Sequence, residues 1–340
     1  MSTASTSIPV IDLSLADDRD ALVQTLRQAC MEKGFFYVVG HGLTSDYLRN
    51  VLQESQQLFH LPLPTKQGLS DPTMSRGYTA MREETLDPQH QRVGDTKEGF
   101  YIGRHVPTTD PRYNPAKFTG PNQWPTETDM PEFRATMEDY FAQLSAVALQ
   151  LTRLLASSLD LPAPHFDAAF VEPLAVLRLL HYEATESRPE DGVLACGAHS
   201  DYGMLTLLLT DETPGLQIFT KQNEWLDVPP RPVLVKGATV DEIPLVVNLG
   251  DMLERWTNGV YRSTVHRVVT SGTAERYSIP FFYEPAYDTL VECLPTCTSS
   301  PDNPPKYPPI TSGDHLKAKY QETHADYAGG SATEEETKKD

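Results

Sequence analysis

Two histidines and one aspartate are the residues of this sequence best suited to do chemistry. His199 and Asp201 stand two positions apart in the segment AHSDYG, and His266 follows in the strand-like segment STVHRVV. Because side chains two positions apart on a strand point to the same face, His199 and Asp201 should project together. Two imidazoles and one carboxylate form the facial set that holds non-haem Fe(II) and leaves coordination positions open. For the His-x-Asp pair taken alone, simple hydrogen bonding at a strand end is the competing interpretation.

An arginine and a serine form a second group with chemical potential. Arg276 and Ser278 are also two positions apart in a strand-like segment, RYSIPFFYEP. A guanidinium binds a carboxylate with two charge-assisted hydrogen bonds, and the hydroxyl adds a third donor. An arginine inside a barrel requires an anionic partner, although one of the 47 acidic residues could also pair with it. A zinc hydrolase that uses two histidines and an aspartate would leave Arg276 and Ser278 without a function, and it lacks an evident general base.

Short apolar strands that can position these residues occupy the second half of the chain. They are AVLRLLHYE, MLTLLLTD, GLQIFT, PLVVNLGD, STVHRVV and RYSIPFFYEP. Turn residues separate them, which is typical of an antiparallel sandwich or barrel. Helices precede the strands, so we predict an α+β protein with a double-stranded β-helix (jelly-roll) core and an N-terminal helical or mixed region packed around it.

The first half of the chain is more mixed. The pattern predicts a strand over 8–14, a helix from about 21 to 34, a buried strand over 35–39 and a helix over 46–59. Residues 65–127 show little periodicity but carry aromatic and basic side chains, which favours an ordered functional stretch. The predicted regions are an N-terminal region (8–125), a long supporting helix (130–160), the jelly-roll core (171–290), a C-terminal segment (291–328) and a disordered tail (329–340).

Composition restricts the partners and the compartment. The 340 residues include 28 Lys and Arg against 47 Asp and Glu, a formal charge of −19, which argues against nucleic acid and anionic membranes as partners. The sequence shows no secretory signal and no apolar run long enough for a membrane span. Its four cysteines lack a CxxC spacing and are few for a disulfide framework. We therefore expect a cytoplasmic protein, a monomer or homodimer, that acts on a small molecule.

Taken together, these motifs resemble a known family. The sequence is similar to the isopenicillin-N-synthase-like branch of the Fe(II)/2-oxoglutarate-dependent dioxygenases over roughly residues 8 to 290. The segments that carry the resemblance are IPVIDLS, GFFYVVGHG, RGY, LRLLHYE, HSDYG, GLQI, DVPPRP, VVNLGDMLERWTNG, STVHRV and RYSIPFFYEP. The resemblance implies an oxidoreductase of secondary metabolism that uses Fe(II), O2 and 2-oxoglutarate, with ascorbate as a helpful additive in vitro. No catalytic residue is implied beyond the metal centre.

The resemblance also implies individual roles. His199, Asp201 and His266 match the iron ligands, and Arg276 and Ser278 match the pair that binds the distal carboxylate of 2-oxoglutarate. Tyr182 matches a tyrosine that often contacts the co-substrate. The family frequently has an asparagine two residues before this tyrosine, where this chain has Leu180. Asn248 and Asp251 are interpreted as structural turn residues. An insertion over 233–245 is expected to form an enlarged surface loop or a lengthened hairpin, with an oligomer contact as one role.

The substrate is expected to bind at the barrel mouth. Candidate contacts are Arg76, Tyr78, Lys97, Tyr101, Leu205 and Phe282. Because Arg76 and Lys97 are cations in an acidic protein, they suggest an acidic substrate, such as an amino acid or a carboxylated metabolite. The expected reaction is hydroxylation, desaturation or cyclisation of a small metabolite, coupled to oxidative decarboxylation of 2-oxoglutarate.

Two other functions stay open at this point. One is an isopenicillin-N-synthase-like oxidase that uses no 2-oxoglutarate, in which the arginine and serine bind a substrate carboxylate instead. The other is a non-enzymatic small-molecule receptor on the same scaffold, which loss of a metal ligand would favour. Formation of succinate distinguishes the first alternative from the dioxygenase.

Overall fold

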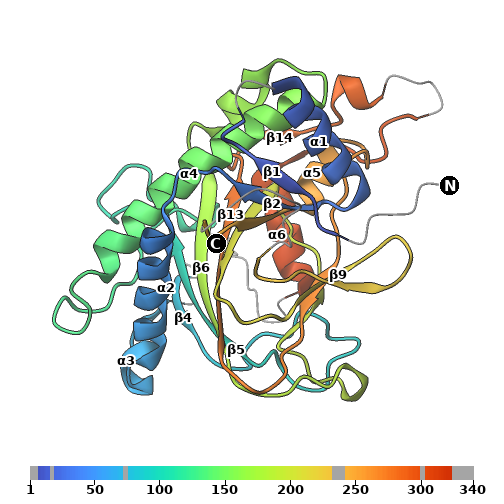
Figure 1. The fold of residues 1–340 in the computed structure, drawn as a ribbon. Coiled ribbons are helices and arrows are strands. Elements are labelled where there is room, and N and C mark those ends of the chain that lie inside the picture. Colours follow the sequence, from blue (N-terminus) through green and yellow to red (C-terminus); the bar gives the residue numbers. More distant parts are fainter. Residues whose placement is uncertain (1–6, 16–18, 72–75, 232–241, 299–302, 324–340) are drawn as a thin grey trace, which may run out of the picture.

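Two β-sheets form the centre of the protein. The structure is a computed structural model that describes residues 7–15, 19–71, 76–231, 242–298 and 303–323 (Figure 1). The larger sheet has nine strands, in the spatial order β1 (Val10–Asp12), β2 (Phe35–Val39), β11 (Leu245–Leu249), β8 (Leu205–Thr210), β13 (Arg276–Glu284), β6 (Leu174–Tyr182), β5 (Lys97–Gly103), β4 (Arg76–Thr79) and β3 (Ser70–Asp71). The smaller sheet has the order β10 (Trp225–Asp227), β9 (Leu216–Phe219), β12 (His266–Val268) and β7 (Cys196–His199). Strands β14 (Leu290–Val291) and β15 (Ile310–Thr311) form a separate pair.

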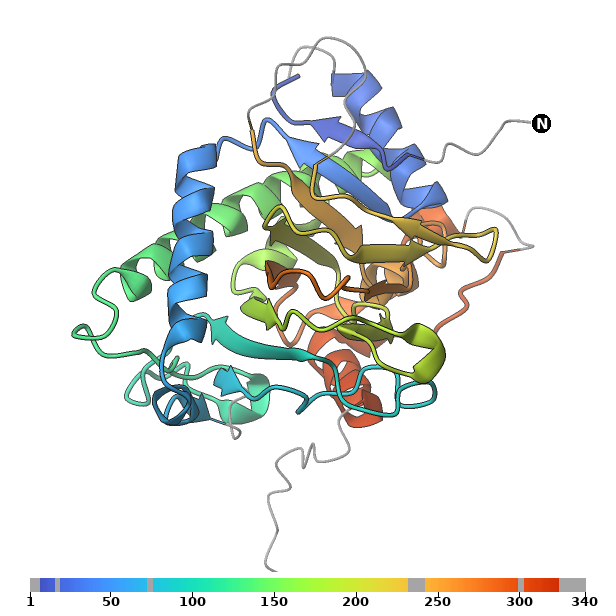
Figure 2. The same ribbon diagram turned by 60° about the horizontal axis from the view of Figure 1, so that its bottom comes forward.

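Helices surround the strands in the described part of the chain. They are α1 (Arg19–Glu32), α2 (Ser45–His60), α3 (Leu63–Gln67), α4 (Phe133–Ser158), α5 (Asp251–Trp256) and α6 (Ser312–Thr323). Helices α1, α2 and α4 contact the larger sheet. Short 3-10 helices span Pro115–Lys117, Ala163–Phe170, Pro189–Asp191 and Pro295–Cys297. In the turned view of Figure 2, α1 and α6 lie on opposite sides of the strands. The N-terminal segment contributes to the same sheet as the core, since β2 pairs with β11.

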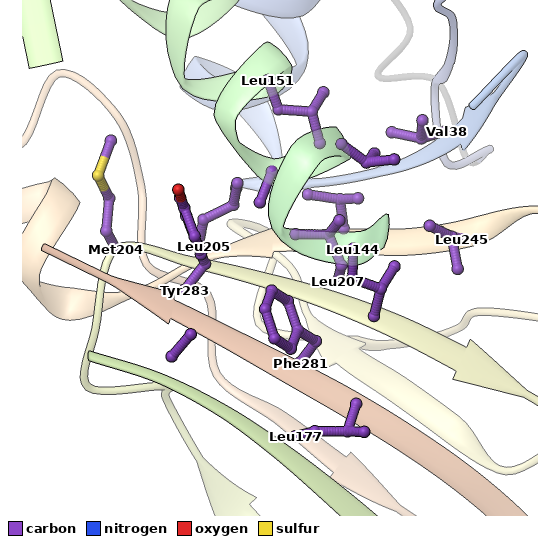
Figure 3. Close-up of a cluster of buried hydrophobic side chains, with 14 of the residues drawn as sticks. Val38, Leu144, Leu151, Leu177, Met204, Leu205, Leu207, Leu245, Phe281 and Tyr283 are labelled. Carbon is purple, nitrogen blue, oxygen red and sulfur yellow. The ribbon is translucent and has the colours of Figure 1, made fainter. Parts of the chain in front are cut away.

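The long helix α4 packs on the outer face of the larger sheet. Its buried residues recur at helical spacing, as expected for an amphipathic helix with one face in the core. Figure 3 shows Leu144 and Leu151 of this helix pointing toward Leu207 and Phe281 of the sheet. All four side chains are fully buried. This layer fixes the outer face of β8 and β13 and leaves their other face for the interior.

Leu151→Ala is expected to lower the free energy of unfolding by about 2–5 kcal/mol, because it removes buried contacts and leaves a cavity. Leu151 lies on the outer face of the sheet, so the chemistry of the interior should persist. Denaturant unfolding of the variant beside Gln150→Ala, an exposed neighbour on α4, measures the difference. A loss of less than about 0.5 kcal/mol, the usual range for a surface substitution, would contradict the assigned packing.

Strand alternation divides the side chains of β13 and β8 between core and interior. Phe281 and Tyr283 face the helices, whereas Ser278, Pro280 and Phe282 line an interior cavity. Residues of the two sets alternate along the strand, because successive side chains of a β-strand point to opposite faces. The interior cavity is therefore bounded by alternate residues of the larger sheet and by residues of the smaller sheet.

The segment 65–127 contains strands that its sequence does not indicate. Strand β5 pairs with β6 over seven consecutive residues, and β4 pairs with β5. The sequence of β5, KEGFYIG, holds two glycines and two charged residues, which disfavour a strand on propensity alone. Pairing with the apolar strand β6 decides its conformation. The segments 232–241 and 324–340 lie outside the described residues, and with them most of the predicted insertion and the whole predicted tail.

Candidate metal centre

The three residues singled out for metal binding meet at one end of the cavity. One ligand atom from each of His199, Asp201 and His266 lies within 4.8 Å of the other two. Asp201 Oδ1 is 3.8 Å from His199 Nε2 and 3.7 Å from His266 Nε2. Register explains the meeting, because His266 on β12 is the direct cross-strand partner of His199 on β7. Two imidazole nitrogens and one carboxylate oxygen can thus face a single cation.

Backbone carbonyls orient both imidazoles. His199 Nδ1 lies 2.8 Å from the carbonyl oxygen of Gly197, and His266 Nδ1 lies 3.1 Å from that of Thr264. A proton on Nδ1 that donates to a carbonyl leaves the lone pair of Nε2 free for a metal. Burial, together with the neighbouring His199, lowers the pKa of His266. Both effects favour the neutral imidazole that a metal ligand must be.

Two side chains of the larger sheet orient the Asp201 carboxylate. Its Oδ2 accepts hydrogen bonds from Asn248 Nδ2 at 2.6 Å and from Thr206 Oγ1 at 2.5 Å, which leaves Oδ1 toward the histidines. Burial alone would raise the pKa of Asp201, but His266, His199 and these two donors outweigh it and lower that pKa. The interpretation of Asn248 as a turn residue is therefore wrong. It lies inside β11, where its side chain points into the cavity and supports a candidate ligand.

Asn248→Ala is expected to weaken Fe(II) binding by roughly 10- to 100-fold, the usual cost of removing a group that orients a metal ligand. The carboxylate of Asp201 would keep its charge and lose one of its two fixed donors. Metal titration under nitrogen, with Asn50→Ala on the exposed side of α2 as control, measures the effect. Unchanged iron affinity in both variants would show that Thr206 alone suffices to orient Asp201.

The chain that follows Asp201 is held in place from two sides. The amide of Asp251 donates to the carbonyl oxygen of Asp201 at 2.8 Å, and the amide of Met204 donates to Glu284 Oε2 at 2.6 Å. A Cβ atom on Gly203 would overlap the Glu284 carboxyl group, so a larger residue there would require that carboxyl group to move. Burial raises the pKa of Glu284 to about 8. From α6, His315 contacts the Tyr202 carbonyl at 2.8 Å, a buried role that its sequence context does not reveal.

Beside the candidate metal ligands, a buried arginine has two nitrogens without partners. Arg276 is 2% exposed, and among the described residues its Nε and Nη1 have no hydrogen-bond acceptor. Its guanidinium lies 5.0 Å from the ring centre of Tyr182, its cross-strand partner. Arg276, Tyr182 and Ser278 line the same cavity as the His-Asp-His group, and its volume is about 70 Å³. A carboxylate bound there would satisfy the unpaired nitrogens, so the donor set fits a ligand such as the distal carboxylate of 2-oxoglutarate.

Comparison with known proteins agrees with this geometry. Residues 8–127 match the family described as "non-haem dioxygenase in morphine synthesis N-terminal", and residues 173–285 match the 2OG-Fe(II) oxygenase superfamily. The chain is 37% identical to the 2-oxoglutarate-Fe(II) type oxidoreductase hxnY of Emericella nidulans, a match that covers 94% of this chain and 91% of the relative. The chain belongs to the 2OG-Fe(II) oxygenase superfamily.

Two further similarities extend this result. Kihadalactone A synthase LFS of Citrus sinensis is 36% identical, with 94% of each chain covered. A full-length Neurospora crassa protein, crystallised in complex with alpha-KG and 5-formyluracil, superposes with a TM-score of 0.78 at 30% identity, covering 93% of this chain and 96% of that one. The prediction of a jelly-roll α+β fold is confirmed. The protein is an Fe(II)- and 2-oxoglutarate-dependent dioxygenase, an oxidoreductase that uses O2 and acts on a small metabolite.

The cavity of this oxygenase contains some of the predicted substrate contacts and not others. Lys97 and Phe282 line it, whereas Arg76, Tyr78, Tyr101 and Leu205 are not among its lining residues. The hydroxyl of Tyr78 donates to Glu98 at 2.6 Å, and Leu205 belongs to the core. The prediction for β8 was wrong by one position, because Thr206 rather than Leu205 faces the candidate metal ligands.

The two remaining candidates contact other protein groups. Arg76 donates to the carbonyl oxygen of Phe118 at 2.9 Å and lies over Gly103, where a Cβ atom would meet its guanidinium. The hydroxyl of Tyr101 donates to Glu84 at 3.0 Å. Arg178, a residue the sequence did not single out, lines the cavity and lies 4.3 Å from the ring centre of Tyr101. Its place on β6, an even number of positions before Tyr182, was a signal that it shares the interior face.

Across the described segments, no helix combines the length and the apolar character that crossing a bilayer requires.

Proposed function

We propose that His199, Asp201 and His266 bind the Fe(II) ion and that Arg276 and Ser278 bind the distal carboxylate of 2-oxoglutarate. The observation that carries the proposal is the position of Arg276, which lines the same cavity as the His-Asp-His group and has two nitrogens without an acceptor among the described residues. A buried guanidinium with two free donors calls for an anion, and the co-substrate is one. Tyr182 flanks the guanidinium and limits where it can lie.

Each protein group has a defined task in the reaction. When bound, the iron and 2-oxoglutarate supply the oxidising power for cleavage of a substrate C–H bond, with succinate and CO2 as co-products. Asn248 and Thr206 hold Asp201 so that one oxygen faces the metal. The carbonyls of Gly197 and Thr264 hold the imidazoles in the ligating tautomer. The apolar side chains Leu208, Leu216, Val268 and Phe282 help to exclude water from the cavity.

The substrate is proposed to be a small organic molecule that is hydroxylated, desaturated or cyclised beside the metal. Solved relatives support a small ligand, since the Neurospora crassa protein was crystallised with thymine and with 5-formyluracil. The net charge of −19 argues against nucleic acid as a partner. We also propose that the protein acts in the cytoplasm as a monomer or homodimer; its four cysteines are free thiols in the described structure.

The test uses the purified protein reconstituted with Fe(II) under nitrogen. Addition of 2-oxoglutarate should produce a weak visible charge-transfer band, and admission of O2 should then release succinate. A protein that shows neither the band nor succinate would contradict the assignment. Oxygen consumption without succinate would instead support the oxidase that uses no 2-oxoglutarate.

A further inference from the structure

Two cations line the cavity in addition to Arg276. Lys97 on β5 is 3% exposed and Arg178 on the neighbouring strand β6 is 8% exposed. If their charges were free, they would attract a carboxylate, and Lys97 is one of the two cations, with Arg76, for which the sequence suggested an acidic substrate. Their surroundings lead to a different conclusion.

Two carboxylates that are not part of the cavity lining neutralise these cations. Glu84 Oε2 lies 2.6 Å from Arg178 Nη2 and 3.1 Å from Lys97 Nζ. Lys97 Nζ also pairs with Asp95, and the hydroxyl of Tyr101 donates to Glu84 Oε1 at 3.0 Å. Glu84 and Asp95 are not among the residues that line the cavity. They cancel the positive charge without offering a surface to a ligand.

The local environment keeps both Lys97 and Arg178 charged. Burial would lower the pKa of Lys97, but Cys196, Glu84 and Asp95 outweigh it and raise that pKa. Burial would likewise lower the pKa of Arg178, and Glu84 raises it instead. Glu84 and Asp95 thus form charge-assisted contacts with the two cations.

The charges of the cavity therefore balance without a charged substrate. Lys97 and Arg178 match Glu84 and Asp95 in number. Under the proposed function, on which this step rests, Fe(II) and Arg276 carry three positive charges, and Asp201 and the two carboxylates of 2-oxoglutarate carry three negative ones. Among the described residues that line the cavity, no cation is left over. A carboxylate would then enter a buried, neutral site and lose its hydration without compensation.

One hydrogen-bond donor of Arg178 has no partner among the described residues. Its Nε has no acceptor among the described residues, although the side chain is more than nine-tenths buried. Gly99 makes room for the guanidinium, since a Cβ atom there would lie 3.3 Å from both Nε and Nη2 of Arg178. Leu86 and Phe282 add apolar surface to the same cavity. The cavity lining is thus mostly apolar, and it includes an arginine that has one donor without an acceptor among the described residues.

From this arrangement we propose that the oxygenase selects an uncharged substrate with a hydrogen-bond acceptor. Arg178 donates to the acceptor, and Glu84 acts as a positioning residue that holds Arg178 and cancels the charge that would attract a carboxylate. The substrate class is a small neutral molecule with a carbonyl or similar acceptor, such as an amide, lactam or ketone.

The test compares acids with their primary amides. The probes are benzoate with benzamide, nicotinate with nicotinamide, and phenylacetate with phenylacetamide. Each is titrated under nitrogen into protein that already shows the Fe(II)–2-oxoglutarate visible band, and binding is followed by that band and by the thermal midpoint. Because every preparation must show the band first, loss of the proposed function is detected separately from loss of charge selectivity.

Glu84→Gln should increase the affinity for the acids by roughly tenfold or more, because one buried positive charge becomes uncompensated, while affinity for the amides changes little. Lys97→Met should lower the affinity for the acids, because it removes a buried positive charge. This variant serves as the test if Glu84→Gln does not fold. Glu190→Gln removes the same charge from an exposed position and should match the unmodified protein. Tighter binding of acids than amides by the unmodified protein would overturn the proposal. The proposal would also be overturned if Glu84→Gln bound the acids no more tightly than the unmodified protein does. If Glu84→Gln does not fold, the proposal would be overturned if Lys97→Met bound the acids no more weakly.

Discussion

Asp201→Ala should remove Fe(II) binding and lower the rate of succinate formation by more than about 1,000-fold, since loss of an outer group that only orients a ligand already costs up to about 100-fold. Two neutral imidazoles would remain without the negative charge that balances the cation. The donors Asn248 and Thr206 would lose their acceptor as well. Metal analysis after gel filtration, with circular dichroism as a measure of folding, separates loss of iron from loss of structure.

Asp191→Ala is the matched control for this experiment, because it removes a carboxylate from an exposed position. It should retain a full equivalent of iron and full activity. Stoichiometric iron in Asp201→Ala would exclude the proposed ligand set. The result would then point to His199 and Asp201 as a simple hydrogen-bonding pair at the end of β7.

Arg276→Ala should raise the dissociation constant of 2-oxoglutarate by roughly 30-fold to more than 1,000-fold, the range expected when one partner of a buried charged pair is truncated. Iron affinity should change little, because the proposed role of Arg276 is to bind the co-substrate rather than the metal. Anaerobic titration of the visible band measures 2-oxoglutarate, and metal titration measures iron. Ser278→Ala should show a smaller loss, since it removes a single hydrogen bond.

Arg267→Ala provides the control for Arg276, because Arg267 lies on β12 and stacks 4.0 Å from the ring centre of Trp225, away from the cavity lining. It should bind 2-oxoglutarate normally. If Arg276→Ala loses iron and 2-oxoglutarate to the same degree, the arginine has a structural role and the co-substrate assignment fails.

Residue types and short-range spacing were enough to predict the candidate metal group. The i, i+2 spacing of His199 and Asp201, and of Arg276 and Ser278, places each pair on one face of a strand wherever the strand lies. The periodicity of 130–160 likewise predicted the long helix now described as α4, because burial of one helical face repeats at a fixed interval. Local patterns of this kind are independent of the partner element.

The register of a strand decides which of its faces points to the interior. A short apolar run does not encode that register. In MLTLLLTD both Leu205 and Thr206 are compatible with burial, and only the packing of α4 on the outer face assigns Thr206 to the interior. The same holds for β5, whose conformation depends on pairing with β6.

The sequence by itself predicted the candidate metal ligands, a carboxylate-binding arginine and the jelly-roll class, because these rest on residue types and spacing within segments, on the order of the apolar strands and on the resemblance to a known family. Tertiary structure alone decided that Asn248 supports Asp201, 47 positions away in the chain. It also decided that Glu84 neutralises Arg178 from a different part of the chain. Electrostatic compensation depends on distance in space, so Lys97, which the sequence suggested as an attractor for acids, has its charge neutralised by Glu84 and Asp95.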